Sequence, residues 1–231
     1  FYYPAEAEDV TERINTRELI LGTILEMTGG QTNTYSHMLI QNVLEKHQYL
    51  EQKERAFIKR VCEGTMENLI WLDYVIDQFS KVKTNKMKPV IRSVLRMSVY
   101  QLFYMDSVPA SAVCDEAVKL ARKKGFHNLT GFVNGVLRTI SRQKETVKLP
   151  DETTQPLQYL SVCYSMPMWI VEKWCREYGY DITKKMLVAL LQKRPTTIRC
   201  NLSRVSAEEL KERLEKEGVT VTQSPYLNYA F

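Results

Sequence analysis

The sequence lacks the long apolar run that a membrane-spanning helix requires, since none of its 231 residues lies in a stretch approaching about 18 consecutive apolar side chains. Its start, FYYPAEAEDVTER, also lacks the basic segment and apolar stretch of a secretory signal. We therefore expect no membrane partner and a cytoplasmic location. A hydrophobic fraction of 44% is ample for one large or two modest domains.

Motifs for metal or redox chemistry are missing as well. The five cysteines lie far apart and none falls in a C-x-x-C pair, while the three histidines show no metal-ligand spacing. We expect reduced, mostly buried thiols and no metal site.

Acidic residues are absent from two long blocks. Residues 81–96 contain six basic side chains and no Asp or Glu, and residues 117–144 contain seven basic side chains and again no acid. The net charge of +5 is mild, but two acid-free blocks indicate a positive face. Such a face favours binding of a polyanion through counterion release, or it is simply a solubilising surface.

The first two-thirds of the chain read as helices and contain no strand pattern. The stretch KPVIRSVLRMSVYQLFYM, residues 88–105, has apolar residues on most of its circumference, which is typical of a helix wrapped by others. Arg92 and Arg96 occupy its narrow polar side, where we expect a solvated edge that pairs with neighbouring acids. Ser111 is a plausible N-cap for a later helix. We expect an all-α domain of about seven helices, with the remaining ones at 14–28, 35–46, 51–68, 70–80, from Ser111 to Gly125, and 130–143.

The pattern changes in the last third. Residues 144–158 are polar with two prolines and read as a linker, and two helices are expected before Pro195. The period-two segment TTIRCNL then predicts a strand with Ile198, Cys200 and Leu202 inward and Arg199 and Asn201 outward.

A complete helix-start signal follows that strand. Ser206 with Glu209 forms a capping box, and VTVT from Val219 predicts a second strand. Strand, helix and strand in this order predict a right-handed parallel crossover. Two strands seldom form a stable sheet, so either one or two further strands come from elsewhere or the domain is not finished within this chain. We expect a small and incomplete α/β domain.

The helical region resembles a known fold. The segments IRSVLRMSVYQL, VPASAV, DEAVKLA and GFVNGVLR are similar to the C-terminal half of the NusB fold, and the resemblance covers roughly residues 13–143. Within it, Gly131 and Gly135 are expected to let helices approach closely, and Asn134 and Arg138 to contact RNA or a partner domain. NusB antitermination factors carry an arginine-rich N-terminal segment that binds RNA. The matching region of this chain has only two arginines, Arg13 and Arg17.

Both regions together resemble the N-terminal part of the small-subunit ribosomal RNA cytosine-5 methyltransferase B family, also called RsmB or Sun. The resemblance implies a mainly α chain with a NusB-like domain at 1–143, a linker at 144–158 and a small α/β RNA-recognition domain at 159–231. It also implies that an S-adenosylmethionine-binding catalytic domain follows in the whole protein. The implied partners are small-subunit ribosomal RNA and that C-terminal domain.

The chemistry of 5-methylcytosine formation has no candidate residues here. A cysteine thiolate must add to the cytosine ring, and the family's cysteines for this step stand in Pro-Cys and Thr-Cys contexts, which none of the five cysteines has. Cys200 reads as a core residue. No glycine-rich loop follows a strand, so we expect no cofactor in this chain and no catalytic activity from it alone.

Recognition of RNA is the remaining function. Arg199 and Asn201 match the R-x-N element that the resemblance places near the active site and facing RNA. Alternatives are a NusB-type regulator that binds RNA and protein, or a structural arm that packs on the catalytic domain. The candidate RNA-binding residues are Arg199, Asn201, Arg194, Lys193, Asn134, Arg138, Arg142, Lys119, Arg122, Lys123 and Lys124.

Overall fold

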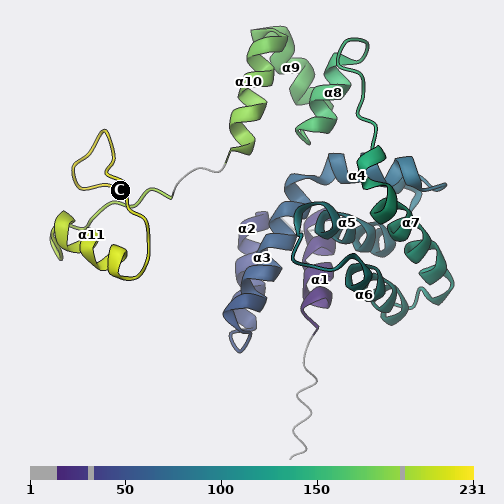
Figure 1. Ribbon diagram of the computed structural model, residues 1–231, viewed down its shortest axis with the longest axis horizontal. Helices are drawn as coiled ribbons and strands as arrows, with labels where there is room; N and C mark the ends of the chain where they lie inside the picture. Colours follow the sequence, from purple (N-terminus) through teal and green to yellow (C-terminus); the bar gives the residue numbers. More distant parts are fainter. Residues whose placement is uncertain (1–14, 31–33, 193–195) are drawn as a thin grey trace, which may run out of the picture. The chain divides into compact units, whose positions relative to one another are not determined.

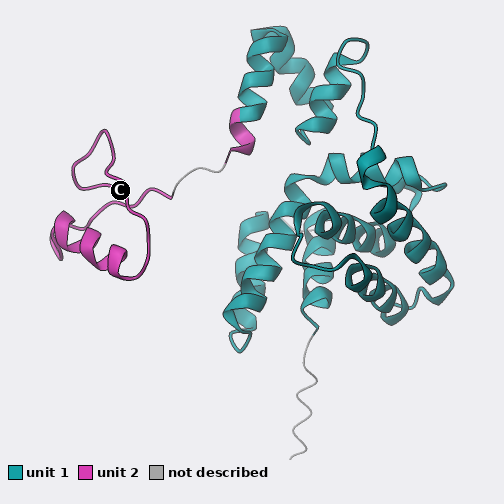
Figure 2. Cartoon of the chain, in the orientation of Figure 1, with its two compact units in different colours: residues 1–188 teal, residues 189–231 magenta. Residues whose placement is uncertain are grey.

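The computed structural model describes residues 15–30, 34–192 and 196–231. Over these residues the chain is mainly helical and forms two compact units that divide between Val188 and Ala189 (Figures 1 and 2). The mainly α fold class is thus confirmed. The helices are α1 (Thr16–Thr28), α2 (Ser36–Lys46), α3 (Gln52–Glu67), α4 (Leu69–Phe79), α5 (Pro89–Tyr104), α6 (Ala110–Lys123), α7 (Thr130–Gln143), α8 (Pro156–Cys163), α9 (Met168–Tyr178), α10 (Tyr180–Leu191) and α11 (Ala207–Lys216).

Helices α1 to α7 form a bundle around α5 (Figure 1). Helix α5 contacts α1, α3, α4, α6 and α7, and ten of its sixteen residues are buried, nine of them consecutive from Ser93 to Gln101. Pro89 occupies its first turn, where the missing N–H costs no hydrogen bond. The predicted seven-helix domain with a wrapped central helix is confirmed.

The polar side of α5 differs from the prediction. Arg96 is only 6% exposed and donates two hydrogen bonds to Asp73 of α4, from Nε to Oδ1 at 2.7 Å and from Nη2 to Oδ2 at 2.5 Å. A bidentate pair of this kind neutralises a guanidinium that would otherwise be buried with its charge uncompensated. Arg96 therefore holds α4 against α5. The expected pairing of Arg96 with an acid is confirmed, whereas its expected place on a solvated edge is wrong.

The glycines of the bundle lie in different surroundings from those expected. A Cβ at Gly64 of α3 would come within 2.1 Å of the Tyr100 ring, so α3 and α5 approach closely there. A Cβ at Gly131 or Gly135 of α7 would meet nothing within 4 Å. The prediction that the two glycines of α7 let helices approach closely is therefore wrong.

Helices α8 to α10 form a small cluster of their own, packed around Leu160, Val171 and Leu187. The backbone N–H of Ile70 donates to Ser165 Oγ at 3.0 Å and connects this cluster to the start of α4. Helix α8 begins at Pro156, inside the stretch that reads as a linker. Helices α9 and α10 agree with the two helices expected before Pro195.

The second unit, residues 189–231, contains α11. Ser206 Oγ accepts a hydrogen bond from the N–H of Glu209 at 3.1 Å, which confirms the predicted helix start. No strand forms among the described residues, where Arg199 and Ala230 make an isolated antiparallel bridge. The expected α/β domain with two strands in a parallel crossover is thus not confirmed.

The backbone pairing of residues 198–200 explains why the predicted parallel strands do not form. Ile198 and Phe231 exchange two backbone hydrogen bonds at 2.9 and 3.0 Å, and Cys200 donates to Tyr229 at 2.8 Å. The partner of this segment is therefore residues 229–231, which run antiparallel to it, and the paired stretch is too short to be a strand. Leu202, expected to face inward, is 59% exposed because the chain turns at Asn201.

Candidate nucleic-acid interface

The basic C-terminal end of α6 is tied to acidic side chains. Lys123 and Lys124 approach Glu18 of α1 at 2.6 and 2.8 Å, and Lys119 approaches Glu116 at 2.8 Å. Hydrogen bonds from Lys123 and Lys124 lower the pKa of Glu18 below its usual value, and the hydrogen bond from Lys119 does the same for Glu116. The acid-free block in the sequence is therefore partly neutralised by acids outside it.

The arginines of α7 are placed differently. Arg138 and Arg142 are exposed and make no ion pair within residues 15–30, 34–192 and 196–231, whereas Asn134 is half-buried. Both arginines line a hollow of about 140 Å³ between α6 and α7. Among the described residues, the candidate cations of the helical bundle thus fall into lysines of α6 that pair with acids and arginines of α7 that do not. Arg122, also on α6, is exposed.

The two residues of the R-x-N element are both exposed, as the sequence predicts. They border a hollow of about 490 Å³ together with Cys200, Leu202 and Tyr229. The side-chain Oδ1 of Asn201 accepts hydrogen bonds from the N–H and Oγ of Ser203, so this asparagine also shapes the turn that follows it. Lys193 and Arg194 lie outside the described residues.

Cys200 is a core residue, as predicted. Its side chain is 3% exposed and its Sγ donates to the carbonyl of Val205 at 3.3 Å. All five cysteines are free thiols, and burial raises the pKa of Cys62 to about 12. The raised pKa of the Cys62 thiol is the opposite of what a cysteine nucleophile requires.

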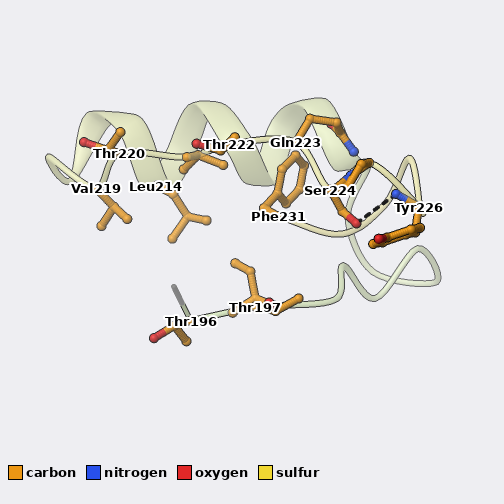
Figure 3. A pocket seen from close by; sticks show the side chains of 13 residues that line it. Thr196, Thr197, Leu214, Val219, Thr220, Thr222, Gln223, Ser224, Tyr226 and Phe231 are labelled. Carbon is orange, nitrogen blue, oxygen red and sulfur yellow. Dashed lines mark hydrogen bonds between the residues drawn. The ribbon is translucent and has the colours of Figure 1, made fainter. Parts of the chain in front are cut away.

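An apolar cavity of about 510 Å³ lies in the second unit (Figure 3). Leu214, Val219 and Phe231 project into it from α11 and the segments after it, and Thr196 and Thr197 border the opposite side. It has no charged lining residue. The cavity therefore suits apolar groups and offers no cation to a phosphate.

Several of these features have no local signal in the sequence. Lys124 and Glu18 are 106 residues apart, and Tyr229 reaches the hollow beside Arg199 only through the pairing at the end of the chain. The described residues contain no group of three side chains suited to a metal ion. Among the described helices, none combines the length and the apolar character needed to cross a membrane.

Comparison with known families divides the chain in two. Residues 14–142 match the NusB family, and residues 166–231 match the ferredoxin-like domain of RsmF/B-like methyltransferases. A relative from Bacillus subtilis (strain 168), described as a probable ribosomal RNA small subunit methyltransferase B, is 31% identical over 210 residues. That alignment covers 91% of this chain and 46% of the relative, so the chain spans about half the length of the curated relative it matches.

Solved structures agree on the fold. The crystal structure of PH0851 superposes with a TM-score of 0.62 at 20% identity and covers 94% of this chain and 48% of that protein. A structure of T. maritima NusB superposes with a TM-score of 0.51 at 25% identity and covers 55% of this chain and 89% of that protein. The first likeness shows the fold alone, and the second matches the helical bundle in extent.

Proposed function

Because the chain belongs to the NusB family, and a methyltransferase-associated domain follows in the same chain, we propose that it is the RNA-binding N-terminal region of a 16S ribosomal RNA cytosine-C5 methyltransferase. The order of the two matched domains carries this proposal. A relative described as a ribosomal RNA small subunit methyltransferase B aligns with both of them in a single alignment. In this account the arm positions ribosomal RNA in the cytoplasm for a catalytic domain that lies outside this chain.

The division of labour follows the sequence expectation. Residues 1–143 form the NusB-like domain, residues 144–158 the linker, and residues 159–231 the RNA-recognition domain that precedes the catalytic domain. Arg199 and Asn201 contact RNA, with Lys193 and Arg194 adding phosphate contacts just before them. In the helical domain the phosphate contacts come from Arg122, Arg138 and Arg142, with Asn134 beside them, while Lys119, Lys123 and Lys124 contribute less because they also face acids.

S-adenosylmethionine would supply the methyl group in the whole enzyme. The described residues do not fit this cofactor, since they offer no strand followed by a glycine-rich turn into a helix. We therefore place the cofactor and the catalytic thiolate in the following domain. The part played by this chain is to bind and orient RNA.

The test is binding of the chain to unmodified small-subunit ribosomal RNA, measured by fluorescence anisotropy. The double variant Arg199→Ala, Asn201→Ala should bind about 10-fold more weakly, which is the loss of about one good polar contact. Lys216→Ala is the matched control, because it also removes one exposed positive charge from the second unit. Equal affinities of the double variant and the control would remove Arg199 and Asn201 from the interface.

Two other functions give different results in the same experiment. A NusB-type regulator would keep its full RNA affinity after deletion of residues 144–231, because the match to T. maritima NusB covers 55% of this chain. A purely structural arm would show no binding of RNA even at low salt. Residues 166–231 count against the regulator, since their match is to a methyltransferase-associated domain.

A further inference from the structure

The hollow between α6 and α7 is lined by residues of both helices, and its polar groups belong to two serines and two arginines. Ala110, Ser111 and Cys114 contribute from the first turns of α6, and Arg138, Ser141 and Arg142 contribute from the last turns of α7. Cys114 is 3% exposed, while both arginines are exposed. The volume of about 140 Å³ is small, so the hollow suits one compact group rather than a base or a peptide.

Arg138 and Arg142 lie on the same side of α7. They are four residues apart, and side chains at this spacing lie one above the other on a helix. Neither makes an ion pair or a hydrogen bond to any other residue in the described part of the chain, unlike Lys119 and Lys124 on α6. Their charges are therefore available to a ligand.

The remaining groups of the hollow are hydrogen-bond donors or neutral. The hydroxyls of Ser111 and Ser141 line it, and the first amides of α6 have no acceptor inside the helix. Arg138 also acts on the Cys114 thiol, where its charge opposes the upward shift that burial gives the pKa of this group. Asp115 acts on the same thiol in the direction opposite to Arg138 and raises its pKa.

The surface beside the hollow has room for a chain. Gly131 and Gly135 precede Arg138 on the exposed face of α7, and a side chain at either position would meet nothing within 4 Å. No Asp or Glu occurs between residues 117 and 144. An extended polyanion can therefore continue along α7 from the hollow without meeting an acid of that helix.

We propose that the hollow binds a phosphodiester group of the ribosomal RNA, held by the guanidinium groups of Arg138 and Arg142 and by the hydroxyls of Ser111 and Ser141. This inference rests on the proposed function and adds to it a defined phosphate site on the helical bundle. It also assigns Lys123 and Lys124 of α6 a structural part, since their pairing with Glu18 holds α1 against α6.

The test is the salt dependence of RNA binding by the whole chain. Unmodified small-subunit ribosomal RNA is titrated at 50 and 200 mM KCl with the wild type and with Arg138→Ala, Arg142→Ala. We expect the slope of log K against log salt to become shallower by about 1 to 2 in the double variant, because one or two phosphate contacts are lost. The control Lys46→Ala, Lys53→Ala removes two exposed charges from the same unit and should keep the wild-type slope.

The outcomes separate this inference from the proposed function. Loss of slope that Arg138→Lys, Arg142→Lys restores supports the site, since lysine keeps the charge, and it rules out a folding defect as the cause. A wild type that binds RNA with the same slope as the alanine variant overturns the site alone, as does an equal loss in the control. A wild type that binds no RNA overturns the proposed function.

A separate arm addresses free anions. Calorimetric titration of the wild type with inorganic phosphate should show no saturable binding below about 1 mM, because a single exposed anion loses the contacts that a polyanion makes along α7. Tight binding of inorganic phosphate that the double alanine variant abolishes would assign the hollow to a small anion and overturn its assignment to RNA.

Discussion

Two helical glycines differ sharply in what surrounds them. Gly64 faces the Tyr100 ring across the contact between α3 and α5, whereas Gly135 on α7 faces open space. Glycine in a helix is less favourable than alanine by roughly 1 kcal/mol. Only at Gly64 does packing explain the glycine, because a methyl group there would displace a buried aromatic ring.

The pair gives a matched prediction for stability. Gly64→Ala should lower the free energy of unfolding by about 1 to 3 kcal/mol through overpacking, and Gly135→Ala should raise it by about 0.5 to 1 kcal/mol. Urea unfolding of the two variants, followed by circular dichroism, measures both. A stabilising Gly64→Ala would mean that α3 and α5 do not approach as closely as described.

Single residues were predictable where burial alone decides their environment. Cys200 alternates with the polar residues Arg199 and Asn201, which predicts that it faces inward, and its side chain is 3% exposed. Arg96 was not predictable, since its partner Asp73 lies 23 residues away on another helix, and the sequence spacing shows only that Arg96 shares a side with Arg92. Leu202 follows the period of its segment, but the turn at Asn201 takes it out to solvent.

At the scale of elements, α1 is held to α6 by a three-residue ion cluster. Glu18 pairs with Lys123 and Lys124, and its side chain is 20% exposed. These hydrogen bonds lower the pKa of Glu18 from an ordinary value of about 4.5. A carboxyl group with a lowered folded-state pKa stabilises the fold above its ordinary pKa, and this contribution is lost as the pH falls through the lowered value.

The cluster predicts a pH-dependent effect of Glu18→Gln. The variant should be less stable than the wild type by up to about 1 kcal/mol at pH 7, a small figure because both lysines are partly exposed to solvent. The difference should shrink as the pH falls below about 4.5. Unfolding free energies at pH 7 and pH 3.5 measure it, with Glu26→Gln on the same helix as control. A difference that stays constant with pH would contradict the cluster.

The helices were largely predictable, and the irregular segments were not. The amphipathic period gives α7 its bounds of Thr130 and Gln143 as predicted, whereas α6 begins at Ala110 after Pro109, so Ser111 lies in its first turn and is not the cap. Helix α8 was missed because its eight residues begin at a proline in a polar stretch. The pairing of residues 198–200 with 229–231 depends on a contact about 30 residues apart that no local pattern reports.

At the scale of the whole molecule, the two candidate RNA contacts belong to different units. Arg138 and Arg142 lie on α7 in the first unit, and Arg199 and Asn201 lie in the second. The exposure of all four side chains agrees with the sequence, while the partition of the basic residues into paired and unpaired groups required the structure, because Glu18 is far from α6 in the chain. Under the proposed function, one RNA molecule contacts residues of both units.

The most direct measurement is ultraviolet crosslinking of the whole chain to unmodified small-subunit ribosomal RNA, with the crosslinked peptides identified by mass spectrometry. The account predicts crosslinked peptides from both units, one containing residues 131–142 and one containing residues 199–204. Crosslinks confined to other surfaces, such as α2 or α11, or an absence of crosslinks at low salt, would contradict it.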